Sequence, residues 1–116
     1  MRYSEFAGKS QGGDGSAKLV ANFDYNSAPF LSLLGLDEND YILEIVIKVI
    51  NVFDSGFDMS LGFPANHSEI APSSKISLQR EGSYKFFPYR KSSISETLTA
   101  FFSGTSTKGN GTIFVF

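Results

Sequence analysis

The sequence predicts an all-β protein, an antiparallel β-sandwich or jelly roll of about seven or eight strands. Short runs of alternating apolar and polar residues follow one another along the chain, with turn residues between them. Residues 42–53 are rich in β-branched side chains, which fit a pleated strand better than a helix. No stretch shows the apolar spacing of a three-turn amphipathic helix, which disfavours α/β architectures.

Residues 1–16 differ in composition from the rest of the chain. Residues 9–16 are made of Gly, Ser, Gln, Asp and Lys, a flexible-linker composition, and Tyr3 and Phe6 are the only candidate anchors before them. We therefore expect an extended Gly-rich N-terminal arm over residues 1–16 and a sandwich domain over residues 17–116. The arm either docks along its own domain or contacts a partner.

The first half of the domain predicts two strands, a polar loop and a hairpin. Residues 17–23 alternate as in a half-buried strand, and residues 29–36 form either a strand or one helical turn. After the polar loop 37–40, residues 42–53 predict one strand of about 40 Å. A Gly-containing loop at residues 54–56 and a second alternating run at 57–63 then predict a hairpin. The dry face of the long strand is expected to hold Leu43, Ile45, Ile47 and Val49.

In the second half, Pro64 and Pro72 predict a loop over residues 64–74. Residues 76–79 alternate, Glu81 and Gly82 turn the chain, and residues 84–89 return it. Pro88 cannot donate a ladder hydrogen bond, which predicts an edge strand or a strand end there. Residues 94–102 and 112–116 predict two more strands, of which the last is expected to be paired inside a sheet.

Composition limits the classes of function. The 116 residues suit a single domain, and the absence of cysteine excludes a disulfide framework and a thiolate metal site. A net charge of −2 offers no field for nucleic acid or anionic membrane. No apolar stretch reaches membrane-spanning length, and the N-terminus lacks the apolar segment of a signal peptide, so folding in the cytoplasm is expected.

No catalytic or metal-binding motif stands out. His67 is the only histidine and has no nucleophile elbow or spaced ligands to support it. Asp54 and Asp58 straddle a turn, where Asp is favoured for backbone reasons rather than as a catalytic pair. The acidic loop 37–40 lacks the ligand spacing of a calcium site. We therefore expect no enzyme, no cofactor and no metal.

Residues 84–91 interleave aromatic and basic side chains. Such a pattern occurs in platforms that bind single-stranded nucleic acid, but the net charge disfavours that interpretation. A protein-contact surface is favoured, because aromatic residues are enriched at interface cores. The expected partner-binding residues are Tyr84, Phe87, Tyr89 and Arg90, together with Tyr3 and Phe6 of the arm.

From Tyr41 onward the sequence resembles small β-sandwich structural proteins of tailed bacteriophages, of the capsid decoration or head-fibre type. The resemblance leaves residues 1–40 uncovered and is carried by four features. They are the strand that closes on Val52-Phe53-Asp54-Ser55-Gly56, the pair Leu61-Gly62, the turn Glu81-Gly82-Ser83-Tyr84, and the loop from Ser103-Gly104 through Lys108-Gly109-Asn110-Gly111 into Ile113-Phe114-Val115-Phe116.

This resemblance implies a non-enzymatic virion component. It implies a capsid decoration or cementing protein that binds across major capsid subunits, as a dimer or trimer on the capsid surface, after synthesis in the host cytoplasm. The alternative is a carbohydrate-binding or adhesin module of a phage tail or fibre, to which the surplus of Tyr and Phe would contribute. Sugar platforms most often use Trp, which this chain lacks.

Overall fold

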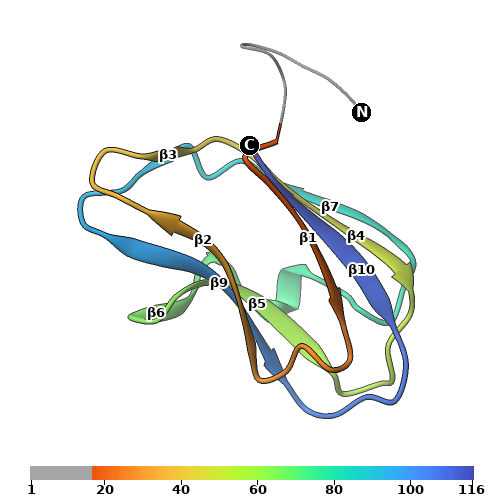
Figure 1. Cartoon of the computed structure of the whole chain (residues 1–116). Coiled ribbons are helices and arrows are strands. Elements are labelled where there is room, and N and C mark those ends of the chain that lie inside the picture. The colour runs from red at the N-terminus through yellow and green to blue at the C-terminus, as the bar shows by residue number, and fades with distance from the viewer. Residues whose placement is uncertain (1–16) are drawn as a thin grey trace.

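The computed structural model describes residues 17–116 as two antiparallel sheets packed face to face (Figure 1). The predicted arm 1–16, with Tyr3 and Phe6, lies outside the described residues. One sheet has the order β1 (Leu19–Asp24), β10 (Asn110–Val115), β4 (Ile45–Asn51) and β7 (Gly82–Phe86). The other has the order β2 (Phe30–Leu36), β9 (Glu96–Ser103), β5 (Asp58–Phe63) and β6 (Asn66–Ala71).

A third, two-stranded element pairs β3 (Tyr41–Ile42) with β8 (Arg90–Lys91) at the upper end of the sandwich in Figure 1. We call this element the end ribbon. The one helical element within residues 17–116 is a single 3-10 turn, η1 (Ser73–Lys75). The all-β sandwich predicted from the sequence is therefore confirmed, and two of its ten strands belong to the end ribbon.

The strand order is that of a jelly roll. If the eight strands of the main sheets are numbered along the chain, the sheets run 1-8-3-6 and 2-7-4-5. Every connection between successive main strands crosses from one sheet to the other, except the β5–β6 hairpin. The chain thus winds around its core, and strands far apart in sequence become neighbours.

This winding contradicts the hairpin predicted for residues 42–63. β4 pairs with β10 and β7, whereas β5 pairs with β9 and β6 in the opposite sheet. Phe53 and Phe57, on either side of the connecting turn, both point into the core and stack on each other, with ring centroids 5.3 Å apart. An alternating pattern with a short loop cannot distinguish a paired strand from one that crosses over, because both bury one face.

The predicted long strand 42–53 is divided. Ile42 and Ile45 are both fully buried, although residues three apart face opposite sides of a continuous strand. The chain breaks between them as it leaves the end ribbon, and the N–H groups of Leu43 and Glu44 donate to the Phe116 carbonyl. Leu43, predicted on the dry face, is 49% exposed, whereas Ile45, Ile47 and Val49 are buried as expected.

Two further expectations are corrected. Residues 64–74 were predicted to be a loop because of Pro64 and Pro72, but they include strand β6. Both prolines lie just outside that strand and so do not interrupt it. Residues 76–79 form no strand, and β7 pairs with β4 instead of with them. Ile76 and Leu78 are nevertheless buried. The alternation therefore indicated correctly which side chains point into the core, although these residues form no strand hydrogen bonds.

The remaining strand predictions agree with the structure. Residues 29–36 hold a strand, β2, and the strands predicted at 17–23, 94–102 and 112–116 correspond to β1, β9 and β10. β10 lies between β1 and β4, inside a sheet, as predicted for the last strand. β7 is an edge strand that ends before Pro88, as that proline indicated.

The lower end of the sandwich is closed by aromatic packing. Phe23, Phe53, Phe57 and Phe102 form a buried ring of four contacts, with centroid separations of 5.3 to 6.0 Å. Gly109 has a φ of 115°, and a Cβ there would lie 2.4 Å from the Phe53 ring.

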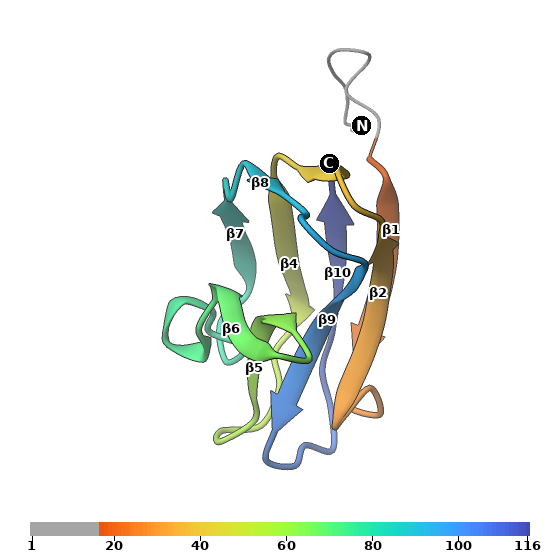
Figure 2. The same cartoon turned by 90° about the vertical axis from the view of Figure 1, so that its left-hand side faces the viewer.

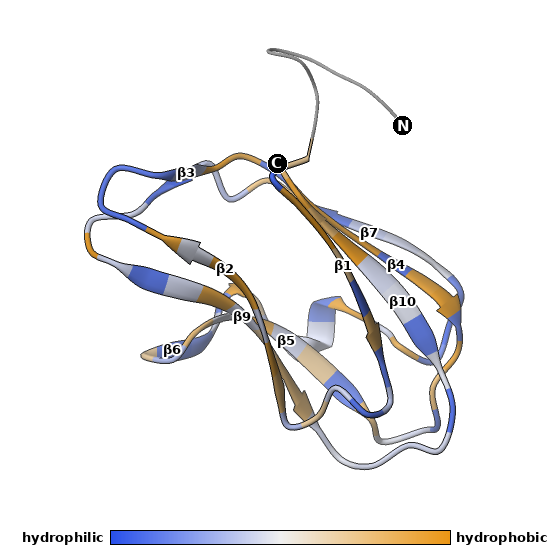
Figure 3. Cartoon of the chain, viewed as in Figure 1, coloured by the Kyte–Doolittle hydropathy of each residue, from blue (hydrophilic) through white to orange (hydrophobic). Residues whose placement is uncertain are grey.

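Figure 3 shows the contrast between the mostly hydrophobic β4 and the largely hydrophilic β6 at the sandwich margin.

Candidate interaction site at the end ribbon

Four apolar side chains stand exposed at and beside the end ribbon. Tyr41 and Leu43 flank the buried Ile42, while Phe87 and Tyr89 precede Arg90 on the other strand. Because Ile42 pairs with Arg90, the two segments lie side by side. The rings of Phe87 and Tyr89 stack at 6.2 Å with an interplanar angle of 20°. We call Tyr41, Leu43, Phe87 and Tyr89 the end patch.

Tyr89 is the residue of the end patch with the least usual backbone. Its φ of 45° lies in the left-handed region, which costs a non-glycine residue about 1 kcal/mol. It is also the most exposed large apolar side chain of the described residues, at 68%. Strained backbone is concentrated at functional sites, where a side chain must be aimed rather than packed. The left-handed backbone of Tyr89 directs its ring into solvent, where it stacks beside the Phe87 ring.

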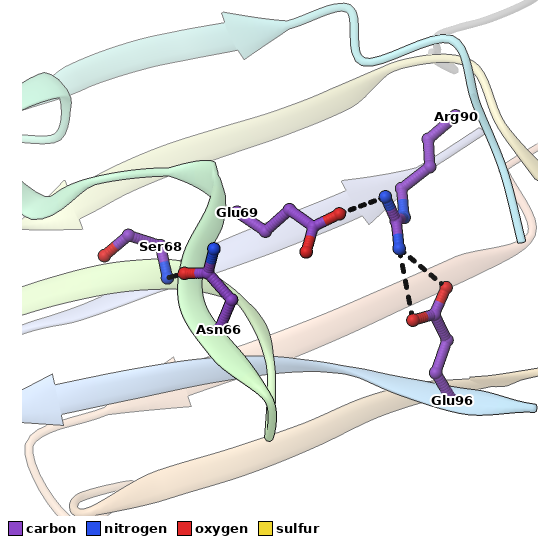
Figure 4. Close-up of polar contacts among 5 residues, drawn as sticks. All are labelled: Asn66, Ser68, Glu69, Arg90 and Glu96. Carbon is purple, nitrogen blue, oxygen red and sulfur yellow. Dashed lines mark hydrogen bonds and ion pairs between the residues drawn. The ribbon is translucent and has the colours of Figure 1, made fainter.

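Arg90 fastens the end ribbon to the second sheet (Figure 4). Its guanidinium forms ion pairs with Glu69 of β6 and with Glu96 of β9, the latter at 3.0 Å. The same guanidinium lies 4.5 Å from the centroid of the Phe63 ring on β5. Since Glu96 is largely buried and Arg90 is less than one-third exposed, these contacts are shielded from solvent. Arg90 thus fixes the position of Tyr89, its neighbour in the chain.

Two backbone hydrogen bonds and one from a side chain also hold the end ribbon. Asn39 N–H donates to the Ser92 carbonyl at 2.7 Å, and Ser92 N–H donates to the Asp40 carbonyl at 2.8 Å. The Lys18 ammonium, one residue before β1, donates to the Tyr41 carbonyl. The end patch therefore lies on and directly beside an anchored ribbon. Tyr41 is in β3, whereas Leu43, Phe87 and Tyr89 lie in the short segments that join the ribbon to β4 and β7.

The structure separates the sequence-predicted partner residues into groups. Phe87 and Tyr89 are exposed and adjacent. Tyr84 instead packs against the core, and its hydroxyl donates to the Ser77 carbonyl at 3.2 Å. Arg90 lies beside the patch, with its guanidinium engaged by carboxylates of its own chain.

Tyr41 and Leu43 were missed by the sequence reasoning. Leu43 belongs to the run 42–53, which reads as one strand with Leu43 on its dry face, and only the break before Ile45 turns it outward. Tyr41 directly precedes that run. The one available signal was Tyr41 itself, an aromatic residue directly after the acidic loop 37–40.

The structure places two of the residues weighed for chemistry, His67 and Asp54, in packing and turn contacts. His67 stacks on Phe101 with centroids 3.7 Å apart. Within residues 17–116, no three His, Asp or Glu side chains are grouped so that they could hold a metal ion. No helix in that part of the chain is long and apolar enough to cross a membrane.

The Asp54 carboxylate binds the loop before β10 at the closed lower end of the sandwich. It accepts hydrogen bonds from the Thr107 N–H at 2.7 Å and the Thr107 hydroxyl at 2.9 Å. These bonds, the backbone one first, lower the pKa of Asp54 below its ordinary value, and Lys108 and Ser106 add to the effect. The Gln79 side-chain amide donates to the carbonyls of Asp54 and Phe57, both at 2.9 Å. It thereby ties the turn between β4 and β5 to residues 76–79, which lead into β7.

Two solved structures have a similar fold. A chain of the "Acidic stable capsid structure of Helicobacter pylori bacteriophage KHP30" superposes with a TM-score of 0.67 at 12% identity, covering 86% of this chain and 85% of that one. A chain of the "Cyanophage Pam1 capsid asymmetric unit" superposes with a TM-score of 0.64 at 8% identity, covering 97% and 92%.

At these identities the likeness is one of fold. No protein-family description matches the sequence, and no curated protein matches it. The similar coverage of both members of each pair means that the matching chains are about as long as this one.

Proposed function

We propose that this protein is a non-enzymatic structural component of a phage virion, specifically a capsid decoration or cementing protein that binds across major capsid subunits. The observation that carries the proposal is the likeness, in both fold and chain length, to chains of two phage capsid structures. A jelly roll of one small domain suits an accessory piece of a shell. It would act on the capsid surface after synthesis in the host cytoplasm.

The end patch is the proposed attachment surface. Aromatic side chains that stand exposed at a rigid site act as anchors in protein interfaces, where they supply much of the binding energy. Phe87 and Tyr89 are such a pair, and the left-handed backbone of Tyr89 is retained at a cost to stability. Arg90 is assigned a positioning role, and Tyr84 supports β7 from the core side. No nucleic acid or membrane is invoked.

The arm 1–16 is proposed as a second contact, through Tyr3 and Phe6. An arm bound to a neighbouring subunit would add contact area across a subunit junction. Removal of residues 1–14 should weaken attachment to particles and leave the sandwich folded. Normal attachment of the shortened protein would contradict this part of the proposal.

The attachment surface can be tested with matched variants. Phe87 and Phe30 are equally exposed, at 54%, but Phe30 starts β2 at the lower end of the sandwich. Phe87→Ser and Tyr89→Asn should reduce co-sedimentation with virus particles at least tenfold, whereas Phe30→Ser should leave it unchanged. Equal loss in all three, or in none, would reject the end patch.

The same material separates the carbohydrate-binding alternative. A cementing protein should co-sediment with particles and show no saturable binding in a titration with host polysaccharide. Saturable polysaccharide binding without particle binding would replace the proposed function by an adhesin. In the sheet of β2, β9, β5 and β6, one face of the Phe101 ring is covered by His67, which stacks on it. That face of Phe101 is therefore not free to stack on a sugar.

A further inference from the structure

The sandwich has four edge strands, and three of them carry features that hinder the addition of another strand. β1 and β2 lie on one side of the sandwich and β6 and β7 on the other (Figure 2). β7 contains Lys85 and β6 contains Glu69, charges that guard an edge. β2 has a register shift between Ser32 and Leu34, which distorts its ladder.

β1 has none of these features. Its six residues pair with β10 in an unbroken register from Leu19 to Asp24. It contains no proline, and its one charged residue, Asp24, lies at its end. An unguarded, regular edge is a template for strand pairing. It is therefore the edge of residues 17–116 best suited to accept another strand.

The direction of the free backbone groups follows from the turn after β1. Asp24 N–H donates to the Ser27 hydroxyl and the Asp24 carbonyl accepts from Ser27 N–H, both at 3.0 Å, so these groups face away from β10. Backbone groups alternate in direction along a strand. Those of Val20 and Asn22 therefore also face away from β10 and are available at the edge.

We propose that β1 pairs antiparallel with β1 of a second copy of this chain, with Val20 opposite Asn22. The arrangement is two-fold symmetric, since Asn22 of the first copy then lies opposite Val20 of the second. Each free N–H and carbonyl of the two residues finds a partner. The two four-stranded sheets would join into one. This isologous pairing names the interface of an oligomer that the sequence left open between dimer and trimer.

Apolar surface favours a second copy over an unrelated strand. Val20 is 58% exposed on the outer sheet face and sits across from Phe114. It becomes a diagonal neighbour of Val20 in the second copy, so both side chains lose solvent exposure.

Sedimentation equilibrium of the full chain tests the proposal. We expect a concentration-dependent dimer. Val20→Glu, which places two like charges at diagonal positions across the new strand pair, should raise the dimer dissociation constant roughly tenfold. Val20→Ile keeps the apolar contact and should leave that constant unchanged. A chain that stays monomeric at all concentrations would overturn the proposal.

Cysteine cross-linking tests the register itself, because the chain has no cysteine of its own. With Val20 opposite Asn22, Ala21 faces Ala21 of the second copy at a Cα separation of about 4.5 Å, within disulfide range. Ala21→Cys should form a disulfide dimer under mild oxidation, and Ser83→Cys on the guarded edge β7 should not. Cross-linking at Ser83 alone, or a dimer that resists Val20→Glu, would contradict the proposed pairing.

Discussion

The two ends of the sandwich place aromatic side chains in opposite environments. At the lower end, Phe23, Phe53, Phe57 and Phe102 come from both sheets and bury one another's rings. At the upper end, Tyr41, Phe87 and Tyr89 stand exposed on or beside a ribbon held by an ion-paired arginine. Residue type is thus a poor guide to role, because the same kind of side chain stabilises the fold at one end and is offered to solvent at the other.

The contrast makes a prediction about where stability resides. Aromatic burial at the lower end should contribute to the free energy of unfolding, and the end patch should contribute little. The end patch should instead govern attachment. Substitutions at the two ends therefore separate stability from binding.

The largest effect is expected at the closed end. Phe57→Ala removes a fully buried ring that contacts Phe53 and Phe102, and should lower the free energy of unfolding by about 3–5 kcal/mol. Denaturant-induced unfolding measures this loss. The fraction that remains folded should still co-sediment with particles, and a loss of attachment without a loss of stability would reverse the assignment of the two ends.

A smaller loss is expected at Arg90, which fastens the end ribbon to the second sheet. Arg90→Met leaves the largely buried Glu96 carboxylate without its cation and should cost about 3 kcal/mol. Adding Glu96→Gln to Arg90→Met removes the orphaned charge and should recover part of the stability, as measured by the same unfolding experiment. A double variant no more stable than Arg90→Met would show that the ion pair is not the source of the effect.

The Asp54 turn should make the closed end sensitive to acid. Its pKa is lower in the folded than in the unfolded state, so the unfolded chain binds the proton more readily. The resulting stability is present above the ordinary pKa of 3.8 and is lost as the pH falls through the lower folded-state value. Unfolding measured from about pH 6 to about pH 3 should show this loss in the wild type and in Asp58→Asn, but not in Asp54→Asn.

The smallest effect on stability is expected at the exposed end. Asn adopts left-handed backbone more readily than Tyr, so Tyr89→Asn should change the free energy of unfolding by less than about 0.5 kcal/mol. Attachment to particles should nevertheless be lost. A destabilisation above about 1 kcal/mol would indicate that Tyr89 is part of the packing rather than an anchor.

Much of the fold could be predicted from periodicity, whereas pairing could not. Ile45, Ile47 and Val49 alternate in sequence and are buried in the structure as a period of two requires. The turn at Asp54 was also recognisable. Whether the chain then pairs back or crosses to the other sheet depends on distant strands, because β4 is paired on both sides by β10 and β7.

The candidate site was predicted in part. Phe87 and Tyr89 were singled out because they alternate with basic residues, and the structure shows them exposed and stacked. Their neighbours Tyr41 and Leu43 lie more than forty residues earlier in the chain, and only the pairing of Ile42 with Arg90 brings them near. Arg90 was expected to contact a partner, but its guanidinium is engaged by Glu69, 21 residues earlier, and by Glu96, six residues later.

The sequence by itself determined that the chain forms strands, which of their faces most often turn inward, and that no reactive motif is present in an obvious spacing. These properties are local, since they depend on side-chain type at short separations. Only the tertiary structure decided the jelly-roll winding, the break at Leu43 and the engagement of Arg90. Those features depend on contacts between residues far apart in the chain, where sequence periodicity carries no information about which strand lies next to which.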